Sequence, residues 1–226
     1  MNSTFDFGEI ANEYDSWYES EAGRKIDEIE KRTFLKYLKK TDVRHIVEIG
    51  AGTGHWTSFF AEQGFCITAT DVSDKMIEVA IAKKISNAVF MQADATNLPF
   101  PDNSVDAIVA VTSIEFVSDR DKAIEEIKRV LKPGGYFIIG TLNLKGSFSA
   151  IRKDSPVFSG ANFYTYKSLV QDLMKIGFPV VEGCLLMPNP AETDTVKIEE
   201  AEQKADPREL NEKGNFLVGF VKKENL

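Results

Sequence analysis

The sequence predicts an α/β protein that contains a doubly wound, mostly parallel sheet of seven strands. Seven short apolar runs are rich in β-branched residues, segments of helical periodicity separate most of them, and 226 residues suit one large domain. Parallel strands need long crossover connections and are buried on both faces. This alternation therefore favours a sheet that is covered by helices on both sides.

Each apolar run is interpreted as one strand. The expected strands occupy residues 44–50, 65–71, 88–94, 105–113, 135–143, 178–187 and 215–223. No helical pattern of comparable quality lies between the last two runs. We therefore expect them to pair at one edge of the sheet, with the last strand antiparallel.

Amphipathic helices are expected between the strands. Apolar residues at helical spacing follow Asp71, where Ser73 is placed as the N-cap, and they recur at residues 123–131 and 169–174. The second of these helices is expected to end at the sequence KPGG and the third at Gly177.

Two segments fall outside this pattern. Residues 1–41 are expected to form an N-terminal helical cap, and residues 42–226 the main domain, with an acidic insertion at about 188–214. Three aromatic residues of the cap either seal the edge of the sheet or close over a flat ligand: Tyr14, Trp17 and Tyr18. The insertion is expected to be a solvated helix or a mobile flap, and a lid over the site is the alternative.

Charge and composition exclude several kinds of partner. The chain has 27 Lys and Arg against 35 Asp and Glu, a net charge of −8, so duplex nucleic acid and anionic membranes are not expected partners. No apolar run approaches a membrane span and no signal peptide is recognised, so we expect a cytoplasmic protein. Cys66 and Cys184 are expected to be buried thiols. With only two histidines, no metal site is expected.

A glycine-rich loop follows the first expected strand. The stretch VEIGAGTGHW carries Gly50, Gly52 and Gly54 at the place where ligands bind in open parallel sheets. A dinucleotide fingerprint would place its third glycine at position 55, which is His55. Glu48 adds negative charge beside the loop, which favours a ligand with an ammonium or sulfonium group over a pyrophosphate.

Acidic residues also end the next two expected strands. Asp71 ends the second strand, where a carboxylate can accept hydrogen bonds from ribose hydroxyls. Asp94 ends the third strand and can accept from an exocyclic amine such as that of adenine. Each residue alone is weak evidence, because Asp is common in turns. The ordered set indicates a nucleoside-containing ligand.

Four blocks occur in one order between about Phe5 and Phe178: VEIGAGTGHW, ITATDVSDKMIEVA, QADATNLPFPDNSVDAIVAVTSIEFV and IKRVLKPGGYFIIGTLN. In these blocks the chain resembles the class I S-adenosylmethionine-dependent methyltransferases, especially the quinone-biosynthesis group. The resemblance implies a Rossmann-like fold, S-adenosylmethionine as cofactor and S-adenosylhomocysteine as product.

The resemblance also implies roles for individual residues. Glu48 and the backbone of Gly50, Ala51, Gly52 and Gly54 should hold the methionine part of the cofactor, and Asp71 its ribose. Val72 and Met76 should pack on the adenine, and Asp94 with the Ala95 amide should contact its edge. Thr112 should lie near the methyl group, and Tyr14 and Tyr18 are candidates for covering the cofactor.

The implied reaction is in-line transfer of the methyl group to a small-molecule acceptor. The cofactor is already activated, so the protein mainly aligns the reactants and excludes water. A base is needed only for some acceptors, and the candidates are His55, Glu115 and Tyr164. Many relatives have His where this chain has Phe116, so a base of the family type is in doubt.

The acceptor is expected to be small and partly apolar. It would face aromatic residues, of which the candidates are Trp17, Trp56, Phe116 and Tyr164. The protein is expected to be a monomer or a homodimer. Two alternatives stay open: a non-enzymatic subunit that binds the cofactor or acts as a scaffold, and, with less support, an NAD-dependent dehydrogenase.

Overall fold

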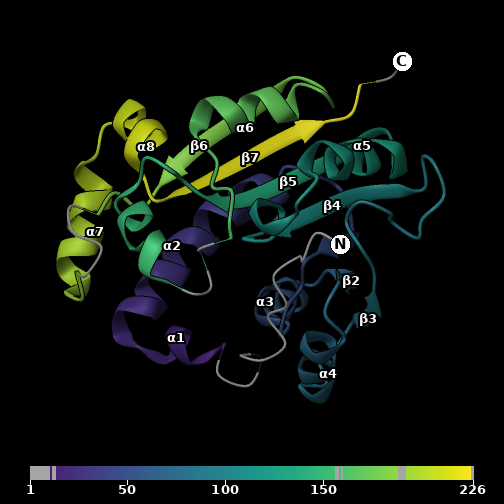
Figure 1. Ribbon diagram of the computed structural model, residues 1–226, viewed down its shortest axis with the longest axis horizontal. Coiled ribbons are helices and arrows are strands. Elements are labelled where there is room, and N and C mark those ends of the chain that lie inside the picture. The colour runs from purple at the N-terminus through teal and green to yellow at the C-terminus, as the bar shows by residue number, and fades with distance from the viewer. Residues whose placement is uncertain (1–10, 12–13, 156–157, 159, 188–191, 225–226) are drawn as a thin grey trace.

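Seven strands form one mixed sheet in the computed structural model, which describes residues 11, 14–155, 158, 160–187 and 192–224 (Figure 1). The sheet order is β3-β2-β1-β4-β5-β7-β6, and only β7 runs antiparallel to its neighbours. The predicted fold class is therefore confirmed. The strands are β1 (His45–Ile49), β2 (Cys66–Asp71), β3 (Ala88–Gln92), β4 (Val105–Val111), β5 (Leu131–Leu142), β6 (Pro179–Cys184) and β7 (Phe216–Lys222).

Helices lie between the strands and before the first of them. The α-helices are α1 (Ser16–Glu19), α2 (Glu21–Leu38), α3 (His55–Glu62), α4 (Asp74–Ala82), α5 (Arg120–Val130), α6 (Tyr166–Leu173), α7 (Thr195–Lys204) and α8 (Pro207–Lys213). Two 3-10 segments, η2 (Ile114–Phe116) and η3 (Ser147–Asp154), follow β4 and β5.

Each face of the sheet has its own apolar core because side chains alternate along a strand. On β1, Ile46 packs in the core that includes α2 and α3, whereas Val47 and Ile49 pack in the core that includes α5 and α6. Helices therefore cover both faces. Residues of α2, from the expected N-terminal cap, share a core with β1, β5 and β7.

The strand order reverses between β1 and β4. The chain passes from β1 through β2 to β3 on one side and then returns to place β4 on the other side of β1. Connections that leave β1 and β4 in opposite directions create a crevice at the carboxyl ends of the two strands. The glycine loop after β1 lies at this crevice.

The expected helices agree with the structure. Ser73 caps α4, where its Oγ accepts a hydrogen bond from the Met76 amide at 3.4 Å. The apolar positions of α5 are buried. β5 begins at Leu131 rather than at residue 135, because Leu131 already pairs with Val105 on β4, and KPGG lies in the register shift before the next pair, Tyr136 with Ala107.

The expectation for Cys66 was wrong. Its side chain is exposed because Cys66 begins β2 and pairs with His45, which is exposed at the start of β1. Cys184 is buried as expected.

The described part of the acidic insertion forms α7 and α8. Glu199 on α7 forms ion pairs with Lys25 at 3.2 Å and Arg32 at 3.6 Å, both on α2. Ile198 is 1% exposed and joins the core beside α2. This helix therefore contacts α2, although Ile198 is its only buried residue. Within the described residues, no helix is long and apolar enough to cross a membrane.

Candidate active site

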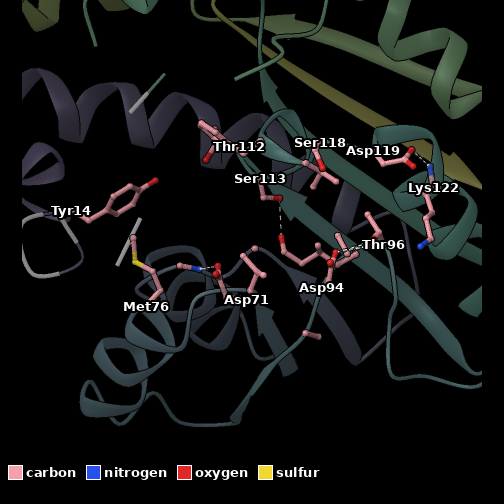
Figure 2. A pocket seen from close by; sticks show the side chains of 18 residues that line it. Tyr14, Asp71, Met76, Asp94, Thr96, Thr112, Ser113, Ser118, Asp119 and Lys122 are labelled. Carbon is pink, nitrogen blue, oxygen red and sulfur yellow. Dashed lines mark hydrogen bonds between the residues drawn. The ribbon is translucent and has the colours of Figure 1, made fainter. Parts of the chain in front are cut away.

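A cleft opens at the carboxyl ends of β1, β2 and β4 (Figure 2). The loops after these strands, residues 93–96 after β3 and the start of α5 line it, and Tyr14 closes one side. Nine predicted cofactor residues line this cleft: Tyr14, Gly50, Gly52, Asp71, Val72, Met76, Asp94, Ala95 and Thr112. Among the described residues, the lining does not include the other four, Tyr18, Glu48, Ala51 and Gly54.

The three glycines of the loop have positive φ angles, but they serve different purposes. At Gly50 an added Cβ would lie 2.2 Å from the Cβ of Ser113, so this glycine lets the β1 and β4 loops pack together. At Gly54 it would lie 2.8 Å from a side-chain carbon of Ile85. At Gly52 it would meet nothing within 4 Å, although Gly52 lines the cleft. Of the three glycines, only Gly52 has open space at the position of a Cβ.

Asp71 organises the glycine loop from the end of β2. Its Oδ2 accepts from the Gly52 amide at 2.8 Å and its Oδ1 accepts from the Ser73 amide at 2.9 Å. Both bonds hold the carboxylate at the edge of the cleft, and Figure 2 shows the one from Gly52. Asp94 is held by Thr96, whose amide and hydroxyl both donate to Oδ1 at 2.8 Å.

Glu48 lies behind the loop on the face of the sheet that α3 covers. Its side chain is 2% exposed and accepts a hydrogen bond from the Thr57 hydroxyl at 2.6 Å. Burial, with a smaller contribution from the charge of Asp71, raises the pKa of Glu48 from 4.5 to about 7, although the hydrogen bond from Thr57 opposes this rise. A cationic group in the cleft would stabilise the negative charge of this buried carboxyl.

Tyr14 and Thr112 face each other across one end of the cleft (Figure 2). Burial raises the pKa of Tyr14 to about 12, with smaller contributions from the charges of Glu115 and Asp71. Thr112 has a φ of 43°, which is unfavourable for a side chain with a branched Cβ. Strain of this kind is often found at functional sites.

Glu115 lies three residues after Thr112, in η2, and is fully buried. Its Oε1 accepts from the Leu142 amide at 3.2 Å, and among the described residues its Oε2 has no hydrogen-bond partner. Burial raises the pKa of Glu115 to about 7, although backbone hydrogen bonds and Arg120 oppose this rise. Glu115 does not line the cleft, but its neighbour Phe116 does.

The other candidate residues lie away from the cleft lining. Tyr164 is fully buried and donates a hydrogen bond to Asp172 Oδ2 at 3.1 Å. Trp56 is 5% exposed and packs against Phe34 in the core, whereas Trp17 is exposed. His55 stacks on Tyr18 with 3.7 Å between the ring centroids.

Several lining residues were not predicted from the sequence. They come mainly from the loop between β4 and α5 and include Ser113, Val117, Ser118 and Lys122. Ser113 and Val117 belong to the end of the third family block, and Ser118 and Lys122 lie beyond it, but none of the four was assigned a role. The signal that they share is their position after the carboxyl end of a central strand.

Comparisons with known proteins point to one family. A family model described as a methyltransferase domain matches residues 47–139. An uncharacterised protein of Methanocaldococcus jannaschii is 31% identical over 186 residues, which cover 78% of this chain and 82% of that protein. A ubiquinone/menaquinone biosynthesis C-methyltransferase of Vibrio cholerae is 33% identical over 142 residues, 59% of this chain. The aligned part spans 54% of that relative, about half of its length.

Two solved structures share the fold. A methyltransferase of Thermotoga maritima, described as S-adenosylmethionine-dependent and a possible histamine N-methyltransferase, matches with a TM-score of 0.71 at 24% identity, over 96% of this chain and 98% of that chain. A putative methyltransferase in a complex with the Haloferax volcanii Trm112 activator matches with a TM-score of 0.73 at 18% identity, over 99% of this chain and 100% of that chain.

Proposed function

The chain belongs to the class I S-adenosylmethionine-dependent methyltransferases, and we propose that it transfers the methyl group of this cofactor to a small-molecule acceptor. The observation that carries the proposal is the cleft at the reversal of strand order, where Gly52 presents bare backbone between Asp71 and Thr112. Family membership favours this function over a non-enzymatic subunit and over an NAD-dependent dehydrogenase.

The residues present fit the cofactor. Open space in front of Gly52 admits a ligand, and the Asp71 carboxylate at the edge of the cleft suits ribose hydroxyls. Val72 is 45% exposed although it is apolar, and it lines the cleft with Met76, which suits a flat apolar base. We propose that Asp94 and the Ala95 amide contact the edge of that base.

Glu48 and Tyr14 would act at the amino acid end of the cofactor. The buried Glu48 carboxyl lies behind the glycine loop, so its negative charge would favour the ammonium group. The cofactor supplies an activated methyl group. Thr112 and Tyr14 would hold the acceptor in line with it and exclude water.

The acceptor would enter beside Tyr14, Thr112 and Phe116. Phe116 supplies an apolar wall and stacks with Phe158 at 6.3 Å between ring centroids. This wall supports a small, partly apolar acceptor. The Vibrio cholerae relative is named for C-methylation in quinone biosynthesis and the Thermotoga maritima structure for histamine. A quinol and a primary amine are therefore the first two acceptor classes to test.

None of the three candidate bases is part of the described cleft lining, and Glu115 comes nearest because the next residue, Phe116, lines the cleft. The Glu115 pKa of about 7 suits proton transfer near neutral pH, and its charge acts on Tyr14 at the mouth of the cleft. His55 and Tyr164 have less support because other side chains engage both of them. We expect Glu115→Gln to lower kcat by at least about 100-fold with an acceptor that must lose a proton. The affinity for S-adenosylhomocysteine should not change.

The experiment is transfer of a labelled methyl group from S-adenosylmethionine to a panel of quinols, amines and small carboxylates. Label in a small-molecule product, at a rate that depends on enzyme concentration, supports the proposal. Label only in a protein or nucleic acid acceptor would contradict the small-molecule assignment.

We also propose that the chain is a monomer or a homodimer, and light scattering on the purified chain tests this. The oligomeric state needs a test because one structural neighbour was solved in a complex with an activator protein.

A further inference from the structure

A short segment before α2 reaches one side of the cleft through Tyr14. We call residues 14–18 the strap. Tyr14 lines the cleft, and Asp15 fixes the strap to both neighbouring loops. Its Oδ1 accepts from the hydroxyl of Thr53, in the glycine loop, at 2.7 Å, and its Oδ2 pairs with Lys83 at the end of α4.

The other end of the strap rests on His55. The rings of Tyr18 and His55 are stacked, with 3.7 Å between centroids and 11° between planes. His55 directly follows Gly54 and begins α3. The stack therefore joins the strap to the helix that leaves the glycine loop.

The orientation of the His55 ring is fixed from α2. Its Nε2 lies 2.9 Å from Asp27 Oδ1 and 2.9 Å from Lys31 Nζ, and Lys31 Nζ lies 2.7 Å from Asp27 Oδ2. A neutral ring can accept from Lys31, and a protonated ring can donate to Asp27. One partner is therefore present in either protonation state.

This cluster is mostly buried, which is costly for charged groups. The exposed fractions of the side chains are 14% for Asp27, 16% for Lys31 and 22% for His55. Burial raises the pKa of Asp27, but hydrogen bonds from His55 and Lys31 outweigh burial and the pKa is lowered. Asp27 is therefore ionised near neutral pH, when it can hold the ring.

We propose that His55 is a positioning residue that docks the strap through its stack with Tyr18, keeps Tyr14 in the cleft and so slows release of the cofactor. This inference rests on the proposed cofactor site. It gives His55 a role that needs no contact with the reacting atoms.

The test is the dissociation rate of S-adenosylhomocysteine, measured by stopped-flow displacement. His55→Ala and Tyr18→Ala each remove the stack and should each speed dissociation roughly tenfold. The double variant should release the ligand at about the same rate as either single variant, because the two substitutions remove the same contact. His45→Ala, at the other histidine, should dissociate at the wild-type rate.

Two further variants separate the stack from the charge cluster. His55→Phe keeps a ring that can stack on Tyr18, so its dissociation rate should be close to that of the wild type. His55→Gln keeps a polar group near Asp27 but has no ring, and it should resemble His55→Ala. If His55→Gln keeps the slow dissociation of the wild type and His55→Phe does not, His55 acts through the charge cluster and the proposal is wrong.

Other outcomes are also decisive. Single-variant rates within twofold of wild type, or effects that multiply in the double variant, would overturn the docking role. If His55→Ala fails to fold, Tyr18→Ala carries the same test from the strap. A wild-type protein that does not bind S-adenosylhomocysteine would instead refute the proposed function.

Discussion

At the scale of single residues, two glycines of one loop should respond differently to the same substitution. Gly50→Ala places a Cβ 2.2 Å from that of Ser113 at a φ of 71°, so it combines overpacking with backbone strain and should lower the free energy of unfolding by about 2–5 kcal/mol. Gly52→Ala has open space, so it should cost only the strain of its φ of 54°, about 1–2 kcal/mol. It should also weaken cofactor binding, because the new methyl group occupies the cleft.

Thermal unfolding and titration with S-adenosylhomocysteine measure these two effects. Binding by Gly52→Ala at the wild-type affinity would show that the ligand does not approach this backbone. In that case Gly52 would be needed only for the turn.

Glu48 should couple stability to pH. Its pKa in the folded protein is about 7, above the ordinary 4.5. Between these values the folded chain holds a proton that the unfolded chain releases, so the free energy of unfolding falls as pH rises through this window. Glu48→Gln should remove this pH-dependent fall. It should therefore raise the free energy of unfolding at pH 8 by up to about 3 kcal/mol and change it little at pH 4.

The same variant should weaken binding of S-adenosylmethionine, because it removes the negative charge behind the glycine loop. Denaturant unfolding at the two pH values and calorimetric titration give both quantities. Loss of stability together with loss of binding would indicate that Glu48 is needed for packing rather than for charge.

At the scale of elements, Arg129 ties α5 to the loop that follows Asp94. Its guanidinium donates to the carbonyls of Leu98 and Phe100, both at 3.0 Å, and to the carboxylates of Glu126 and Asp102. Lysine cannot reproduce this planar set of donors. Arg129→Lys should therefore lower the free energy of unfolding by about 1–2 kcal/mol, measured by denaturant unfolding.

Lys132 provides the matched control. It forms an exposed ion pair with Asp106 at 2.8 Å, so Lys132→Met should change stability by less than about 1 kcal/mol. Equal effects of the two substitutions would mean that the Arg129 hydrogen bonds do not hold the loop.

The strands and the helices between them were predictable because their signals are local. Runs of β-branched residues gave all seven strands, and helical spacing gave the buried face of α5. The docking of α7 was not predictable. Its contacts depend on Lys25 and Arg32, which are far away in the sequence, and it buries only Ile198.

At the scale of the whole molecule, part of the candidate site followed from topology. Asp71 ends β2 and Asp94 follows the end of the neighbouring parallel strand β3, so the fold brings both to the cleft. Aromatic residues in the sequence were a less reliable predictor of the acceptor site. Trp56 and Tyr164 pack inside the fold, because a large apolar ring beside the site gains as much from the core as from a ligand.

The contribution of His55 depends on groups that meet only in three dimensions. Asp27 and Lys31 on α2 surround its Nε2, and Tyr18 covers its ring. The sequence indicated only that His55 follows the glycine loop. Between β4 and α5, the lining residues Thr112 and Phe116 were predicted, whereas Ser113, Val117 and Ser118 were identified only once the fold was known.

The central claim is that the cleft binds S-adenosylmethionine through the glycine loop and Asp71. The most direct measurement is calorimetric titration of the wild-type protein and of Asp71→Ala with S-adenosylhomocysteine, with NAD as the control ligand. We predict binding to the wild type at micromolar concentrations, a loss of at least about tenfold in affinity in the variant, and no binding of NAD. Absence of binding to a folded wild-type protein at saturating ligand, or equal affinity in the variant, would contradict the account.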